Sequence, residues 1–146
     1  MRTAQASFVA AIPKDAEYDH PPGANLARRL HGALSTVFPE IEEFYNWRDC
    51  GWEIRLRSGR VWASVPFAQV SRTGPEWLLA VVPERSVGAM VRAMLGDEED
   101  GRLAVVRRIR GVVHEVLVDV AAGDVLWFFG TPNGRGVRSP EMLDEV

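Results

Sequence analysis

Cysteine, histidine and long apolar runs are scarce in this 146-residue sequence, and each shortage removes a class of function. The single cysteine, Cys50, cannot form an intramolecular disulfide, and with three histidines it makes a poor set of metal ligands. No stretch of the sequence approaches the ~18 consecutive apolar residues of a membrane span. We therefore expect no metal, no cofactor and no membrane partner.

The N-terminal sequence and the net charge argue against a secreted protein and against a general nucleic-acid binder. Phe8 to Ile12 is an apolar run of five residues, which is shorter than the ~7–15 residues of a secretory signal. The net charge of −3 lacks the basic excess of a general nucleic-acid binder. We expect a cytoplasmic protein that does not have nucleic acid as its partner.

What is present is the composition of a globular domain. Apolar residues make up 47% of the chain and charged residues 25%, and a chain of this length is long enough for a substantial core. We expect one domain over residues 1–130. Residues 131–146 are rich in turn-forming residues and are expected to form a flexible C-terminal tail.

Three segments have the spacing of amphipathic helices. Apolar residues at helical spacing predict a helix over residues 24–37, which Pro39 prevents from continuing. The same spacing predicts a second helix between Ser86 and Gly96. The third and longest helix is expected over residues 97–123, and Gly111 weakens its middle by roughly 1 kcal/mol relative to alanine.

Residues 52–65 alternate between apolar and polar side chains, which is the pattern of half-buried strands. A two-residue loop at Ser58-Gly59 would make this segment a β-hairpin. The opposed pairs would then be Arg57/Arg60, Leu56/Val61, Ile54/Ala63 and Trp52/Val65. Arg55 and Trp62 lie together on the face away from the core, as a cation–π pair.

Two later segments, Glu76 to Pro83 and Asp124 to Gly130, are predicted to be buried strands because both of their faces are apolar. Phe8 to Ile12 is expected to be an edge strand. Strands followed by helices predict an α+β fold. We expect a single antiparallel sheet of four to six strands, with three helices packed on one face.

No catalytic set is complete. His114-Glu115 resembles the start of a zinc-protease helix, but the second histidine would have to occupy the position of Val118. Gly130 to Gly136 lacks both the lysine and the following helix of a phosphate loop. Arg107, Arg110 and His114 form a cationic stripe, which suits a carboxylate or phosphate group, or acidic residues elsewhere in the fold.

Two binding hypotheses remain. The first is a non-enzymatic protein-interaction module that binds another protein or its own copy, because Trp and Arg are enriched at interface hot spots. Its surface would be an aromatic and arginine-rich sheet face made of Trp62, Arg55, Arg57 and Arg60. The alternative is a small-ligand binder or enzyme with a pocket between the sheet and the first and third helices. That pocket would be lined by His31, Asp49, Arg110 and His114.

Around Trp47-Arg48-Asp49-Cys50-Gly51-Trp52, the chain resembles a group of small uncharacterised bacterial α+β proteins with a D-x-G-W step. Over roughly residues 24–129 the matching positions are Asp49, Gly51, Trp52, Glu76, Trp77 and Trp127. The resemblance implies a bacterial cytosolic domain and no chemistry. The residues themselves predict a turn at Asp49, an unusual φ at Gly51 and a core position for Trp52.

Overall fold

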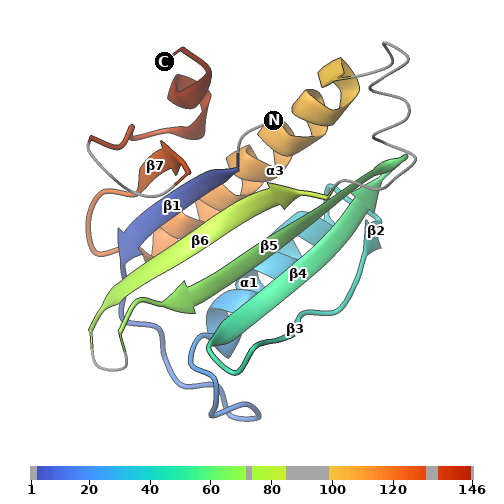
Figure 1. Cartoon of the computed structure of the whole chain (residues 1–146). Coiled ribbons are helices and arrows are strands. Elements are labelled where there is room, and N and C mark those ends of the chain that lie inside the picture. Colours follow the sequence, from blue (N-terminus) through green and yellow to red (C-terminus); the bar gives the residue numbers. More distant parts are fainter. Residues whose placement is uncertain (1–2, 72–73, 85–98, 131–134, 146) are drawn as a thin grey trace.

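One seven-stranded antiparallel sheet organises the chain (Figure 1). The computed structural model describes residues 3–71, 74–84, 99–130 and 135–145. The strands are β1 (Ala4–Val9), β2 (Glu40–Ile41), β3 (Tyr45–Trp47), β4 (Gly51–Ser58), β5 (Val61–Gln69), β6 (Glu76–Pro83) and β7 (Leu126–Phe129). The helices are α1 (Ala24–Ser35), α3 (Glu99–Val120) and the 3-10 helix η1 (Pro140–Glu145).

The α+β class and the single antiparallel sheet are confirmed. The strand order is β2-β4-β5-β6-β1-β7, and β3 also pairs with β4. The sheet has seven strands, more than the four to six predicted, because β2 and β3 add short strands along β4. The second predicted helix, Ser86 to Gly96, lies outside the described residues.

The first strand differs from its prediction in both bounds and position. It spans Ala4–Val9 instead of Phe8 to Ile12, and it lies between β6 and β7 instead of at an edge. Ala4, Ala6 and Phe8 are buried in alternation with exposed or half-buried neighbours. The pattern was hard to see in the sequence because two of the three buried residues are alanines.

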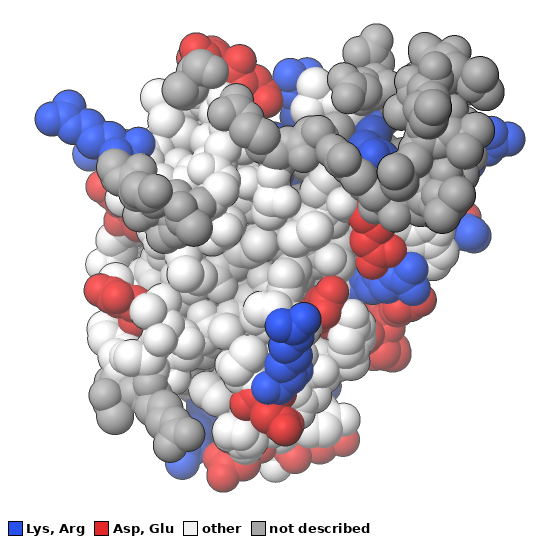
Figure 2. Space-filling model, viewed as in Figure 1, with Lys and Arg blue, Asp and Glu red and all other residues white. Residues whose placement is uncertain are grey.

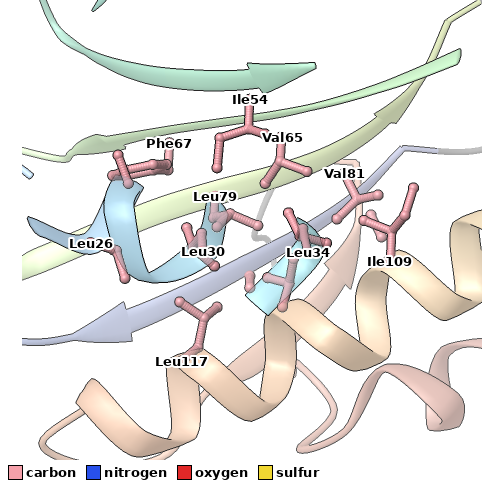
Figure 3. Close-up of a cluster of buried hydrophobic side chains, with 14 of the residues drawn as sticks. Leu26, Leu30, Leu34, Ile54, Val65, Phe67, Leu79, Val81, Ile109 and Leu117 are labelled. Atoms are coloured by element: carbon pink, nitrogen blue, oxygen red, sulfur yellow. The ribbon is translucent and has the colours of Figure 1, made fainter. Parts of the chain in front are cut away.

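Helices α1 and α3 pack on one face of the sheet, and in Figure 1 they lie behind it. We call the opposite face the open face, because no described helix covers it. Leu26, Leu30 and Leu34 of α1 are fully buried at a spacing of four residues. Figure 3 shows them beside side chains of β4, β5, β6 and α3. Burial of each such leucine contributes roughly 1.5–3 kcal/mol.

The β4–β5 hairpin keeps the predicted faces but shifts the predicted register by two residues. Leu56 pairs with Ala63 and Arg57 pairs with Trp62. The loop is therefore Gly59-Arg60, and Gly59 has φ of 59°. Glycine with positive φ at the first loop position is typical of a type II′ turn. A shift of two residues preserves the side of every side chain, so Trp62 remains on the open face.

The D-x-G-W step is a left-handed turn followed by a close approach of two strands. Arg48 and Asp49 have φ of 54° and 57°, and Asn46 and Asp49 are joined by two hydrogen bonds of 2.8 and 2.9 Å. The predicted turn at Asp49 and the buried position of Trp52 are confirmed. The unusual φ predicted for Gly51 is wrong, because the left-handed conformation belongs to the two residues before Cys50.

The C-terminal residues 135–145 do not form the predicted flexible tail. Val137 and Trp127 exchange two backbone hydrogen bonds of 2.7 and 2.9 Å. Pro140 and Leu143 of η1 are buried. This segment therefore packs as part of the domain, against β7 and α3.

Two glycines give opposite expectations when alanine replaces them. A Cβ at Gly51 would lie 2.0 Å from the carbonyl oxygen of Phe67, so Gly51→Ala should destabilise the fold by about 3 kcal/mol. A Cβ at Gly111 meets no atom within 4 Å, so Gly111→Ala should stabilise α3 by about 1 kcal/mol. Urea denaturation measures both changes, and a neutral Gly51→Ala would contradict the close approach of β4 to β5.

Candidate functional site

Trp62 forms a stacked cluster with two arginines on the open face. The guanidinium carbons of Arg55 and Arg57 lie 4.1 and 5.1 Å from the centroid of the Trp62 ring. Arg57 is the direct cross-strand partner of Trp62, and Arg55 comes from the same face of β4. The predicted cation–π pair of Arg55 and Trp62 is therefore confirmed.

The arginines of this cluster are paired with carboxylates from other parts of the chain. Arg55 donates two hydrogen bonds of 2.9 Å to Glu84 and lies 3.7 Å from a carboxylate oxygen of Glu42. The bond to Glu84 raises the pKa of Arg55. Arg57 forms an ion pair with Glu40. The cluster is thus an ordered network with both signs of charge, and not the cationic patch that the sequence predicted.

Arg60 stands apart from this network. It lies in the β4–β5 loop, close in sequence to Trp62, and its side chain is exposed. Among the residues that the structure describes, Arg60 has no ion-pair partner. It is the member of the predicted set whose charge remains available to another molecule.

The open face carries uncharged side chains over most of its width. The register of the strands places on this face Gln5, Ser7 and Val9 of β1, Trp62, Ser64, Pro66 and Ala68 of β5, Leu78, Ala80 and Val82 of β6, and Leu126 and Phe128 of β7. Figure 2 shows this uncharged surface over the middle of the sheet, with charged side chains around it. Sequence analysis predicted a buried strand at β6 because both of its faces are apolar. The described helices cover one face only.

A pocket of about 330 Å³ lies at one end of the open face. The side chains of Val9 and Val70 at this pocket are 40% and 53% exposed, which is unusual for valine in a folded domain. Leu78 and Leu126 also line it, and Glu76 stands beside them. The pocket is therefore a mainly apolar hollow that also has two carboxylates in its lining, Glu76 and Asp124, of which Asp124 is paired with Arg138.

The four residues of the alternative pocket belong to separate places. The ring of His31 packs on Phe44 at 6.3 Å, while Asp49 lies in the β3–β4 turn. Arg110 and His114 are one helical turn apart on α3 and contact β7 and its neighbours. Among the described residues, no hydrogen bond, ion pair or ring contact joins His31 or Asp49 to Arg110 or His114.

A pocket of about 380 Å³ does lie beside α1 and the end of α3, but other residues line it. Its polar groups are already engaged. Arg28 binds Asp15 and Glu17, and its bond holds the pKa of the Asp15 carboxyl well below the usual range. Arg29 pairs with Asp119, and the Asn25 amide donates to two backbone carbonyls.

Arg110 is the most unusual charged residue of the domain. Its side chain is 1% exposed, and none of its three guanidinium nitrogens has a hydrogen-bond partner among the described residues. One carboxylate oxygen of Asp144, Oδ1, lies 3.9 Å from Arg110, and its other oxygen, Oδ2, accepts a hydrogen bond of 2.8 Å from Arg107. Burial lowers the pKa of Arg110. Of the predicted cationic stripe, Arg107 is thus paired with the chain's own C-terminal segment but stays half exposed, whereas Arg110 is buried.

His114 is a hydrogen-bond acceptor for a buried indole. Nε1 of Trp127 donates to Nδ1 of His114 at 3.0 Å, so Nδ1 must be unprotonated for this bond to form. Burial lowers the pKa of His114, against the opposing effect of the Glu141 and Glu115 carboxylates. The histidine therefore has a structural role at the junction of α3 and β7.

Comparison with known proteins adds no family or activity. Neither a protein-family model nor a curated protein matches this chain. The resemblance to small bacterial proteins therefore stays a prediction. No group of three His, Cys, Asp or Glu side chains in the described ranges could hold a metal ion, and none of the helices described is both long and apolar enough to cross a membrane.

Replacing Arg110 with methionine should stabilise the protein. The methionine fills similar space and removes a buried charge that lacks hydrogen bonds, which we expect to raise the free energy of unfolding by about 1–3 kcal/mol. The matched control is Arg108→Met at an exposed position of α3, which should change it by less than about 1 kcal/mol. Loss of more than about 1 kcal/mol in Arg110→Met would mean that the guanidinium is well paired in solution.

Stability should fall as the pH is lowered through the titration of His114. An unfolded histidine has a pKa of about 6.5, and that of folded His114 is lower. The unfolded chain therefore takes up protons first as the pH falls below about 6.5, which favours unfolding. Thermal denaturation between about pH 7.5 and 5 should show a smaller fall in Tm for His114→Gln than for the wild type. A fall in Tm for His114→Gln as large as that of the wild type would contradict this role of His114.

Proposed function

We propose that this chain is a non-enzymatic protein-interaction domain and that the open face of its sheet is the binding surface. The observation that carries this proposal is that β6 is apolar on both faces, whereas the described helices cover only one of them. Leu78, Ala80 and Val82 are apolar and point away from the described helices. Soluble domains rarely leave a contiguous apolar surface of this kind without a partner.

The layout of the open face resembles that of protein interfaces. Such interfaces have an apolar centre, a polar rim and a few Trp, Tyr or Arg residues that contribute most of the binding energy. Here the centre is uncharged, and Trp62 stands at its border between two arginines. Because Glu84 and Glu40 already hold those arginines, the cluster would lose little side-chain entropy on binding.

The chemistry of this surface indicates the chemistry of its partner. A partner surface with many charges would have to bury them against side chains that cannot pair with them, which is costly. The partner should therefore present a flat and largely uncharged protein surface. The central side chains of the open face are small, which suits such a flat contact.

The small-ligand alternative has weaker support. The pocket beside α1 has the volume of a ligand site, but its Arg28, Arg29 and Asn25 are occupied by the chain's own groups. A ligand there would find few polar groups free to orient it. His31, Asp49, Arg110 and His114 do not converge on it.

A charge on the open face should abolish binding without unfolding the domain. Leu78→Arg places an unpaired cation in the proposed interface, and we expect it to weaken partner binding by about 100-fold or more. Trp62→Ala should weaken binding by about tenfold or more. The matched control is Val118→Arg on α3, where the valine is 55% exposed on the helical side.

The measurement begins with capture from the source cell, using wild-type, Leu78→Arg and Val118→Arg chains of equal thermal stability. Proteins retained by the wild type and the control but lost by Leu78→Arg are identified, purified and titrated against each variant. Self-association is measured alongside by sedimentation velocity. The proposal fails when neither any captured protein nor self-association distinguishes Leu78→Arg from Val118→Arg.

A further inference from the structure

We infer that the partner of the open face is a second copy of this chain, packed face to face in antiparallel orientation. This inference rests on the proposed function and adds the identity of the partner and its orientation. It follows from the way that side-chain size and charge are distributed along the strands.

The two ends of the open face have opposite shapes. The tryptophan end carries Trp62, Arg55, Arg57 and Arg60. The pocket end carries the hollow of about 330 Å³ lined by Val9, Val70, Leu78 and Leu126. Trp62 is six residues from Ala68, the partner of Leu78 in β6, and this is about 20 Å along an extended strand. One copy therefore has a large aromatic group at one end and an apolar hollow at the other.

A two-fold axis lying between two sheets and running across their strands would superpose these opposite ends. Trp62 of each copy would then lie over the pocket end of the other copy, and the contact would occur twice. Between the two ends the face carries small side chains, namely Ser64, Pro66 and Ala80. Small central residues allow two sheets to approach to the usual spacing of about 10 Å.

The available charges fit the same arrangement. Arg60 at the tryptophan end and Glu76 at the pocket end are both exposed, and neither has an ion-pair partner among the described residues. They cannot reach each other within one chain. Glu76 lies beside Val70, which is ten residues from Arg60 along the hairpin strand, about 33 Å when extended. In the antiparallel pair, Arg60 of each copy faces Glu76 of the other.

A charge-reversal cycle tests this arrangement directly. Arg60→Glu and Glu76→Arg should each weaken self-association by about tenfold, because each places like charges at both ends of the interface. The double variant Arg60→Glu/Glu76→Arg should recover to within about threefold of the wild type. Sedimentation velocity over a concentration series gives the dissociation constants, and Val118→Arg is the neutral control.

Each other outcome has a definite meaning. A wild type that stays monomeric at its highest soluble concentration overturns the inference, as does a double variant no better than the single ones. A dimer unaffected by Leu78→Arg forms through another surface and also overturns it. In all three cases a captured protein that is lost by Leu78→Arg would leave the proposed function standing, so the two failures can be told apart.

Discussion

The structure depends on burying one face of the sheet beneath α1 and α3. Leu26, Leu30 and Leu34 on one helix and Ile109, Val113 and Leu117 on the other are fully buried. These side chains pack against β4, β5, β6 and β1, whose inward residues are also fully or almost fully buried. A helix that lost this contact would not be stable alone in water, and the sheet would expose its apolar inner face. The remaining features follow from which parts of the sheet this packing covers.

One-sided cover has a direct consequence for β6 and β1, which are central strands. Central strands in a two-layer fold are usually polar on the side that faces water. Here Leu78, Ala80 and Val82 face away from the helices and are only partly exposed. Trp62 and its arginines form an ordered border on the same side. Within the described part of the chain no helix covers this side of the sheet, and the proposed interaction rests on that observation.

Alternation of side chains made the faces predictable but not the register. Ile54 and Leu56 had to face the core and Trp62 had to face away, and the structure agrees. The loop was placed one residue too early, which moved every strand pair by two residues. Alternation repeats every two residues and cannot detect such a shift. The position of Gly59 decides it, because glycine stands first in the observed type II′ loop and would stand second in the predicted one.

Contacts between segments that are far apart in the sequence could not be predicted from local patterns either. Arg55 and Glu84 are 29 positions apart, so the local sequence pattern did not predict their ion pair. Arg110 was correctly placed beside Arg107 and His114 on one helix. Its burial came from Asp144 and η1, which were expected to be mobile. The same segment supplies the cover over Trp127.

The outer strands at both borders of the sheet are short. Along β4, the outer backbone groups are used by β2, by the amide of Glu42 and by β3. At the other border β7 has four residues, and Val137 binds both backbone groups of Trp127. Short, interrupted outer strands are the means by which sheets avoid templating further chains. Within the described residues, β2 and β3 form one outer border as strands of two and three residues, so a partner could extend the hydrogen-bonded ladder there over a short length only.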